Sequence, residues 1–301
     1  MDGIVTLGFD PAETSRQIAE AATASTGSEA VGRDLGLASF AVVIGGREAM
    51  RFYGSTDLDV QDPTGRGPVT RADRASHHAI MDLLRDERPE DVVLSEEGDG
   101  STPVGNASRR WIVDPLDGTQ EFVAGIGEFS VMVGLAVHGS AVLGAVYRPD
   151  PGRLYVGIAD RAAWRVNGER SPEPQPMRID PGSRGLRFAR SRSHPDARLQ
   201  GLVDRLRPDR TILSGSVGTK CALIAEGEAD LYVHPVPYLK EWDTCAPEAV
   251  LRGAGGRVTD CRGEALAYGK PEPGQPYGIF AARSDVWNRV SSTIFDIGKD
   301  I

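Results

Sequence analysis

The sequence predicts a protein that combines α-helices with two kinds of β-structure. Residues 129–166 contain four successive runs of strand-forming residues separated by short turns, and neighbouring runs of this kind favour antiparallel pairing. After residue 185 the pattern changes to strands that alternate with helical segments, which is typical of α/β proteins. The chain of 301 residues is long enough for one large domain or two smaller ones. We therefore expect an α+β part followed by an α/β part.

Local signals predict the helices. Asp10, Pro11 and Glu13 combine an N-cap, a proline at the first helical position and a capping acid. In a later helix, Asp243 is expected to be the N-cap, with Pro247 still in the first turn. Helices are expected from 10 to about 23, at 37–53, from 69, at 197–206, at 217–227, from 242 and from about 285.

Strands and connectors complete the predicted outline. Residues 25–36 are polar and contain glycine, so we expect a linker there. Residues 171–185 hold four prolines, which predicts a connector and a candidate domain boundary. Strands are expected at 91–94, 111–113, 129–137, 141–147, 153–158, 162–166, 186–189, 211–213, 231–233 and near 278–281. The resulting division is an N-terminal extension at 1–36, an α+β domain at 37–180 and an α/β domain at 181–301.

Composition and charge exclude several classes of protein. A net charge of -9 and the lack of a basic run argue against a nucleic-acid-binding protein. No stretch approaches the roughly 18 apolar residues that a membrane span needs, and residues 1–4 lack the features of a signal peptide. Cys221, Cys245 and Cys261 are few, odd in number and not in a metal-binding spacing, so reduced thiols are expected. We therefore expect a cytoplasmic protein that binds neither nucleic acid nor a membrane.

The most informative stretch is residues 111–122. Three apolar residues run into Asp114 and Asp117, which are followed by Gly118 and Thr119. Two carboxylates this close repel each other unless a cation lies between them. Gly118 and Thr119 then offer backbone N–H groups where a helix begins, and such groups bind phosphate oxygens. The stretch therefore predicts a site for metal and phosphate.

Three more acidic residues are candidates for the same site. Glu96 follows a short predicted strand and Asp243 lies at a helix start, although each alone is as well explained as a solvated acid or a cap. Asp73 stands three residues after Thr70, and on that segment alone we favour a capping box. Oxygen ligands suit Mg²⁺ or Mn²⁺, and the lack of clustered histidine and cysteine argues against structural zinc. If Glu96 and Asp243 converge on the two aspartates of residues 111–122, the four can hold two or more cations about 4 Å apart, the arrangement that clamps the oxygens in phosphoryl displacement.

These motifs resemble, in order and spacing, those of the inositol monophosphatase superfamily of Mg²⁺-dependent, lithium-sensitive phosphatases. The resemblance covers roughly residues 37–290, and three motifs in register make it specific. It implies a layered αβαβα sandwich of the inositol monophosphatase and fructose-1,6-bisphosphatase type, often found as a homodimer. The motifs are Glu96-Glu97, Asp114-Pro115-Leu116-Asp117-Gly118-Thr119, and Trp242-Asp243 with Gly255-Gly256 downstream.

Four segments are similar to the 3′(2′),5′-bisphosphate nucleotidases, the PAP phosphatases of this superfamily. Gln120-Glu121-Phe122 replaces an ending in Asn-Phe that is usual in inositol monophosphatases, and residues 241–248 look closer still to the nucleotidases. Residues 191–194 and 215–220 resemble their nucleotide-contacting segments. Lys220 is one of four lysines beside thirty arginines, which favours a specific role for its ammonium group.

The resemblance implies a role for each candidate residue. Two or three Mg²⁺ ions, with Mn²⁺ as a substitute, would be bound by Glu96, Asp114, Asp117, Asp243 and the carbonyl group of Leu116. Asp73 and Thr119 would activate the attacking water, which overrides the capping interpretation of Asp73. Gly118 and Thr119 would hold the scissile phosphate. The nucleotide and its second phosphate would be contacted by Ser193, His194, Ser216 and Lys220.

The implied reaction is removal of the 3′(2′)-phosphate from adenosine 3′(2′),5′-bisphosphate (PAP), with its sulfated form PAPS as a further candidate, to give AMP and phosphate. A phosphatase of the same superfamily acting on an inositol phosphate, a sugar phosphate or a specialised-pathway nucleotide stays open, because its metal chemistry would be identical. A protein that binds metal or nucleotide without turnover is a distant alternative, since every acidic position and Thr119 are present.

Overall fold

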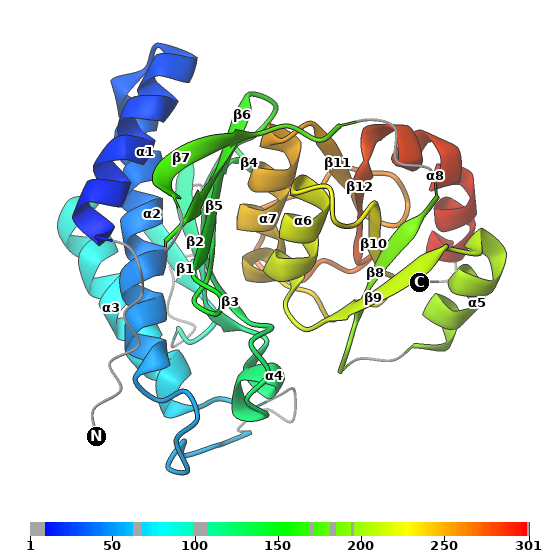
Figure 1. Cartoon of the computed structure of the whole chain (residues 1–301), viewed down its shortest axis with the longest axis horizontal. Helices are drawn as coiled ribbons and strands as arrows, with labels where there is room; N and C mark the ends of the chain where they lie inside the picture. Colours follow the sequence, from blue (N-terminus) through cyan, green and yellow to red (C-terminus); the bar gives the residue numbers. More distant parts are fainter. Residues whose placement is uncertain are drawn as a thin grey trace.

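Helices and sheets alternate in five layers across the molecule (Figure 1). The computed structural model describes residues 10–62, 68–98, 108–168, 171–180, 185–193, 196–299 and 301. The first helical layer contains α1 (Pro11–Thr26), α2 (Glu29–Met50) and α3 (Arg71–Glu87). The central helical layer contains α6 (Val217–Ala225) and α7 (Glu241–Gly253), and the last contains α5 (Ala197–Leu206) and α8 (Ser284–Gly298). A sheet lies between each pair of helical layers, so the predicted αβαβα sandwich is confirmed.

The first sheet has seven strands in sequence order. Its first pair is parallel and the others are antiparallel, as the adjacent strand runs predicted. Both faces are covered by helices, so successive residues such as Ile112 and Val113 enter different hydrophobic cores. Its strands are β1 (Val92–Ser95), β2 (Arg109–Asp117), β3 (Ser130–Val137), β4 (Ser140–Arg148), β5 (Arg153–Ile158), β6 (Ala162–Asn167) and β7 (Ser171–Met177).

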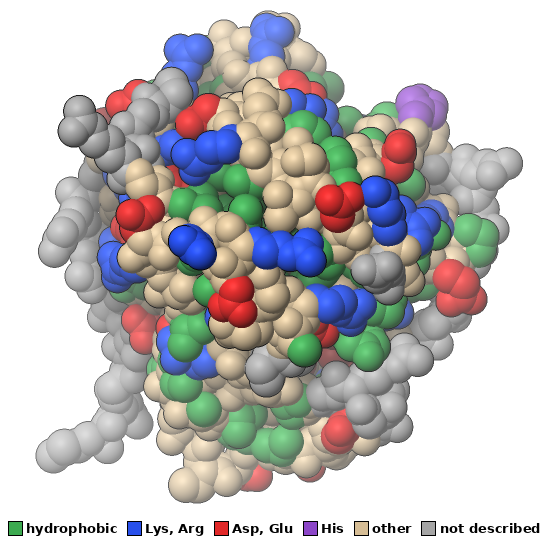
Figure 2. Space-filling view, turned by 90° about the vertical axis from the view of Figure 1, so that its right-hand side faces the viewer, with side chains coloured by type: hydrophobic (Ala, Val, Ile, Leu, Met, Phe, Trp, Pro, Cys, Tyr) green, Lys and Arg blue, Asp and Glu red, His purple; other side chains and the backbone are tan. Residues whose placement is uncertain are grey.

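The second sheet has five strands in the order β11-β12-β10-β8-β9. Strand β8 is parallel to β9 and β10, whereas β12 is antiparallel to β10 and β11. On the outer face shown in Figure 2, basic and acidic side chains of the described residues are interspersed. None of the described helices is long and apolar enough to cross a membrane. The strands are β8 (Arg187–Ser191), β9 (Arg210–Ser214), β10 (Leu231–His234), β11 (Gly256–Thr259) and β12 (Ile279–Arg283).

The predicted linker at 25–36 is wrong, because α2 begins at Glu29 with Ser28 as its N-cap. The glycines that suggested a linker allow two helices to approach closely instead. A Cβ atom on Gly32 would lie 2.6 Å from the carbonyl oxygen of Ala19, and the carbonyl of Gly36 accepts a 2.7 Å hydrogen bond from Ser15 Oγ.

Two other local predictions are also wrong. The proline-rich connector begins with a strand, β7, which pairs with β6 on one side only; an edge strand tolerates prolines because half of its N–H groups need no partner in the sheet. Helix α7 begins at Glu241, so Lys240 is the N-cap and Pro247 lies beyond the first turn. The two sheets lie within 92–177 and 187–283, and the division of the chain into two domains stays a prediction.

Candidate active site

The end of β2 presents two aspartates to one space. The register between β2 and β3 shifts between Asp114 and Asp117, and this irregularity interrupts the alternation of side chains between the two faces of the sheet. Gly118 follows with φ 95°, and a Cβ atom there would lie 3.0 Å from the carbonyl oxygen of Glu128. The short helix α4 (Thr119–Val123) starts directly after it. The predicted metal-and-phosphate stretch thus contains a tight turn at Gly118 that only glycine fits.

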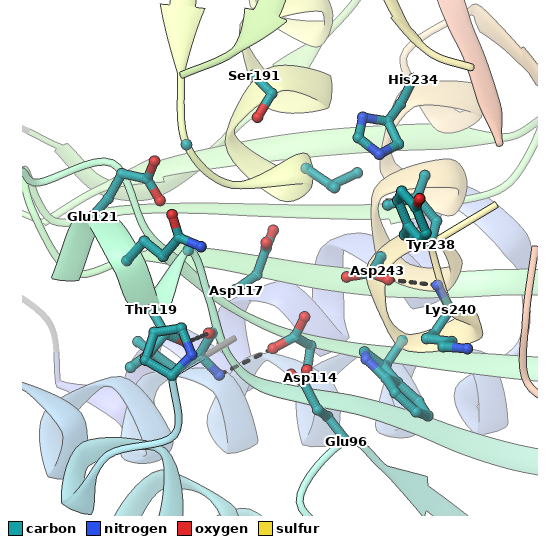
Figure 3. A pocket seen from close by; sticks show the side chains of 18 of the residues that line it. Glu96, Asp114, Asp117, Thr119, Glu121, Ser191, His234, Tyr238, Lys240 and Asp243 are labelled. Carbon is teal, nitrogen blue, oxygen red and sulfur yellow. Dashed lines mark hydrogen bonds between the residues drawn. The ribbon is translucent and has the colours of Figure 1, made fainter. Parts of the chain in front are cut away.

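The structure brings acidic residues from three elements together. One oxygen each of Asp114, Asp117 and Asp243 lies within 4.8 Å of the others, with Asp243 coming from the first turn of α7. Glu96, just after β1, lines the same cavity, and its N–H donates a 3.2 Å hydrogen bond to the carbonyl of Val113. Figure 3 shows the four side chains around one space. The carbonyl oxygen of Leu116, the fifth predicted ligand, lies 3.0 Å from Thr119 Oγ1.

Burial and mutual repulsion make this cluster unfavourable as free carboxylates. Burial raises the pKa of Asp114 well above its usual range, and neighbouring Glu96 and Asp117 add to the effect. Burial and the charge of Asp117 raise the pKa of Asp243 to about 7. Loss of bulk water is the main cause that raises the pKa of Glu96, and the charge of Asp243 adds to it. The residue is nevertheless open to the cavity. A set of crowded carboxylate oxygens fits hard divalent cations such as Mg²⁺ or Mn²⁺.

The metal-free protein is expected to become less stable as the pH rises from 4 to 7. Asp243 titrates near 7 in the folded state and near 3.8 when unfolded, so the folded state binds more protons across this window. The contribution of this extra proton to the free energy of unfolding therefore decreases as the pH approaches 7. The measurement is the thermal unfolding midpoint against pH in EDTA and in excess Mg²⁺. We expect Mg²⁺ to raise the midpoint most at neutral pH, and an equal effect at pH 5 and pH 7.5 would contradict the electrostatic account.

Asp73 forms the expected capping box and also contacts Thr119. Its Oδ2 accepts a 2.7 Å hydrogen bond from the N–H of Thr70, whose hydroxyl also donates to it, so the capping box is present. Its Oδ1 accepts a 3.0 Å hydrogen bond from Thr119 Oγ1. Ser76, one turn later in α3, donates a 2.8 Å hydrogen bond to the carbonyl of Pro115. The start of α3 is therefore fastened to the aspartate-bearing stretch.

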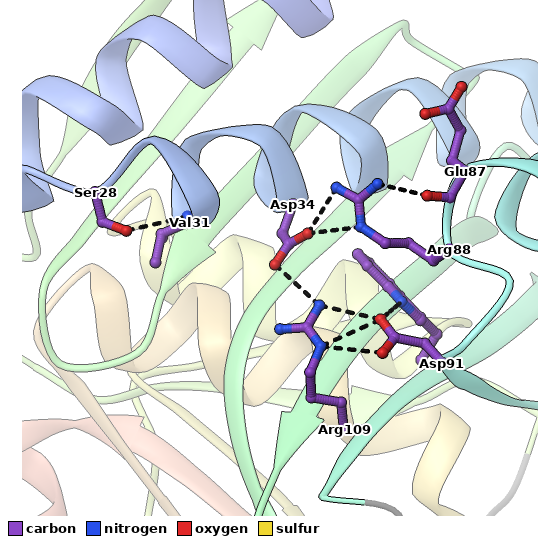
Figure 4. A network of polar contacts seen from close by, with 8 residues as sticks. Ser28, Val31, Asp34, Glu87, Arg88, Asp91 and Arg109 are labelled. Carbon is purple, nitrogen blue, oxygen red and sulfur yellow. Dashed lines mark hydrogen bonds and ion pairs between the residues drawn. The ribbon is translucent and has the colours of Figure 1, made fainter.

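A polar network anchors the strand that carries the aspartates (Figure 4). Asp34 in α2 accepts hydrogen bonds from Arg88 at 2.8 Å and from Arg109 at 3.0 Å. Asp91 accepts from Arg109 at 3.1 Å and from Trp111 Nε1 at 2.9 Å. These contacts join the helical layer, the edge of β1 and the start of β2, and they let the indole of Trp111 be buried with its N–H satisfied.

Three of the four predicted nucleotide contacts lie in described parts of the chain. Ser193 donates a short hydrogen bond to Glu121, and Ser216 Oγ donates to Asp117 Oδ2 at 2.5 Å. Lys220 is 1% exposed, and its Nζ donates to backbone carbonyls and lies 5.0 Å from the centre of the Tyr232 ring. His194 lies outside the described residues. Contact of these residues with a nucleotide stays a prediction.

The sequence indicated only part of one wall of the cavity, which has a volume of about 600 Å³. Ser191 belongs to the segment 191–194 that resembles nucleotide-contacting segments, whereas His234 and Tyr238 were not expected there. Ser191 and His234 lie across from the acids in Figure 3, at the ends of β8 and β10. Tyr238 is 74% exposed and lines the same cavity, as do Tyr232 and Leu239. Within one sequence, a residue at the end of a buried strand looks like sheet core, so no local signal could have found His234.

The sequence model of the inositol monophosphatase family matches residues 36–287. The chain belongs to this family. Among curated relatives, it is 39% identical over 225 residues to the 3′(2′),5′-bisphosphate nucleotidase CysQ of Escherichia coli strain K12, covering 74% of this chain and 89% of that protein. It is 30% identical over 207 residues to the 3′(2′),5′-bisphosphate nucleotidase 1 of Homo sapiens, covering 67% of this chain and 66% of that protein.

Solved structures of the inositol monophosphatase family share this fold. The crystal structure of CysQ from Bacteroides thetaiotaomicron aligns with a TM-score of 0.71 and 30% sequence identity, covering 83% of this chain and 97% of that chain. An inositol monophosphatase from Anabaena aligns with a TM-score of 0.69 at 24% identity, which is a likeness of fold alone. The chain therefore has the fold of the family. Within this fold, Asp114 and Asp243 come close together.

Proposed function

We propose that this protein is a Mg²⁺-dependent 3′(2′),5′-bisphosphate nucleotidase that converts PAP to AMP and phosphate. Its likeness to CysQ nucleotidases over three quarters of the chain supports the activity. The observation that carries the chemistry is the convergence of Asp114, Asp117 and Asp243 beside the hydrogen-bonded pair Asp73–Thr119. PAPS is a second candidate substrate with the same ribose phosphate.

The acidic residues would hold two or three Mg²⁺ ions, with Mn²⁺ as a substitute, and the carbonyl of Leu116 would add a ligand. Such ions supply charge stabilisation and lower the pKa of water. Glu96, Asp114, Asp117 and Asp243 would fix their positions relative to β2 and α7. The backbone N–H groups of Gly118 and Thr119, at the start of α4, would hold the scissile phosphate.

Asp73 and Thr119 would act on the attacking water. Thr119 Oγ1 lies 3.0 Å from Asp73 Oδ1, so its proton can point at the carboxylate and its oxygen lone pair at a water in the cavity. Burial raises the pKa of Asp73, which makes this carboxylate a better proton acceptor than a solvated one. The pair would take the proton as the water attacks phosphorus in line with the leaving ribose oxygen.

The wall opposite the acids would take the nucleoside. Tyr238 presents an aromatic ring that is mostly unpacked, and Ser191, His234 and the apolar side chain of Leu239 also line the cavity. A ring of this kind can stack on a base, whereas an inositol or sugar phosphate has no base to place there. This division into an acidic floor and an aromatic wall favours a nucleotide over the smaller substrates of the family.

A substrate panel tests the proposal. Phosphate release would be measured with PAP, PAPS, inositol 1-phosphate and fructose 1,6-bisphosphate at equal Mg²⁺ concentrations. We expect kcat/KM for PAP or PAPS to exceed that for the other two by at least about 100-fold, since stacking of the base adds binding free energy that neither of the others can gain. A preference for either non-nucleotide would refute the proposed substrate while leaving the metal chemistry intact.

A further inference from the structure

One carboxylate oxygen of Asp117 is held by the N-terminal turn of α6. Asp117 Oδ2 accepts a 2.5 Å hydrogen bond from Ser216 Oγ and a 3.0 Å hydrogen bond from the N–H of Gly218. Asp117 ends β2 in the seven-stranded sheet, whereas Ser216 and Gly218 open a helix of the central layer. Among the described residues, no hydrogen bond reaches the other oxygen, Oδ1. The turn therefore orients the carboxylate and leaves one oxygen for another ligand.

The donors to Asp117 form a chain with a defined direction. Ser216 Oγ lies 2.7 Å from Ser130 Oγ in β3 and accepts a 2.9 Å hydrogen bond from the N–H of Thr219, for which it is the N-cap. An ionised carboxylate can only accept, so the single hydroxyl proton of Ser216 points to Asp117. Ser130 must then donate to Ser216. Both serines are at most 1% exposed, so water does not compete for these contacts.

Lys220 holds this turn in place. Its Nζ donates to the carbonyl of Gly215 in a short contact, to that of Ser216 at 2.8 Å and to that of Ser214 at 3.4 Å. An ammonium group has three N–H donors, so these three carbonyls use all of them. In this arrangement no donor is left for a phosphate of the substrate. The rare lysine has a specific position, but its contacts are with the backbone of the turn.

We propose that Ser216 is a positioning residue for Asp117, and that it sets the affinity of the site for divalent cations and makes no contact with the nucleotide. Residues that hydrogen-bond to a metal ligand commonly change metal affinity by 10–100-fold when removed. The inference rests on the proposed function only in taking Asp117 as a metal ligand. It reassigns Ser216 and Lys220, which the sequence placed against the substrate, to the support of that ligand.

The test compares Ser216→Ala with a matched control, Ser214→Ala. Ser214 lies two residues away at the end of β9 and is 3% exposed, but its Oγ has no hydrogen-bond partner among the described residues. Mn²⁺ binding would be titrated by electron paramagnetic resonance without substrate, and KM for PAP would be measured at saturating Mg²⁺. We expect Ser216→Ala to weaken Mn²⁺ binding by about tenfold or more with KM changed less than twofold. Ser214→Ala should match the wild type in both measurements.

Two results would overturn the inference. One is unchanged Mn²⁺ affinity in Ser216→Ala; the other is a KM for PAP at saturating Mg²⁺ that rises well beyond twofold, which would mean direct contact with the nucleotide. If Ser216→Ala does not fold, Ser130→Ala, which removes the donor behind Ser216, should weaken Mn²⁺ binding by a smaller factor, and an unchanged affinity there overturns the inference. A wild-type protein that binds Mn²⁺ but does not hydrolyse PAP would refute the proposed function and still allow this test.

Discussion

The variant Asp114→Asn is expected to lose metal-dependent phosphate release by about 10³-fold or more. Asp114 is 1% exposed and stands at the centre of the acidic group, so the substitution removes a full charge from the proposed cation site. Loss of several kcal/mol of transition-state stabilisation corresponds to a rate decrease of this size. The measurement is kcat for PAP at saturating Mg²⁺.

The same variant should remain folded. Asparagine keeps an oxygen for the 3.1 Å hydrogen bond that Asp114 Oδ1 accepts from the N–H of Leu116, and it relieves repulsion among the neighbouring carboxylates. We therefore expect its unfolding midpoint in EDTA to be no lower than that of the wild type. Asp82→Asn makes the same chemical change at an exposed position of α3 and should keep full activity. Turnover of Asp114→Asn near the wild-type rate would remove the basis of the metal assignment.

The variant Thr119→Val is expected to lower kcat by about 10²- to 10⁴-fold, the usual contribution of a positioned proton acceptor. Valine has nearly the same shape as threonine but lacks the hydroxyl that lies 3.0 Å from Asp73 Oδ1. Asp73 would keep its two hydrogen bonds from Thr70, so the start of α3 should be undisturbed. Mn²⁺ affinity should stay close to that of the wild type.

Thr119→Ser serves as the matched control, because it restores the hydroxyl and changes only the methyl group. We expect it to recover most of the activity that valine loses. If Thr119→Val and Thr119→Ser have the same kcat, the hydroxyl takes no part in the reaction. If Thr119→Val instead weakens Mn²⁺ binding, the residue acts through the metal site, and the assignment of the pair to the attacking water is wrong.

Local chemistry explains which parts of the fold were predictable from the sequence. The antiparallel strands and the later α/β alternation follow from hydrophobic runs and turns that are contiguous in the chain. The linker predicted at 25–36 failed because Gly32 and Gly36 were taken as signs of flexibility. These glycines instead allow α1 to pack closely on α2, and this contact can be seen only in the folded structure. The strand β7 was missed for a similar reason, since prolines are acceptable there only because it lies at an edge.

The candidate site was also predictable only in part from the sequence. Asp114, Asp117 and Thr119 lie within six residues, so their meeting was foreseeable from the stretch itself. In the wall that contains Ser191, only this residue lies in a segment that the sequence singled out. His234 and Tyr238 come from another strand end and a loop and leave no local pattern. Lys220 was recognised as unusual by its rarity, but composition does not say which atoms its ammonium group will contact. Its carbonyl partners are set by the fold of the backbone just before α6.

The measurement that tests the central claim most directly is identification of the products formed from PAP. The wild-type protein would be incubated with PAP in Mg²⁺ and in EDTA, with the nucleotide separated by chromatography and phosphate quantified in parallel. We predict AMP and inorganic phosphate in a one-to-one ratio with Mg²⁺ and no reaction in EDTA. Release of the 5′-phosphate to leave adenosine 3′-phosphate, or equal turnover without a divalent cation, would contradict the account.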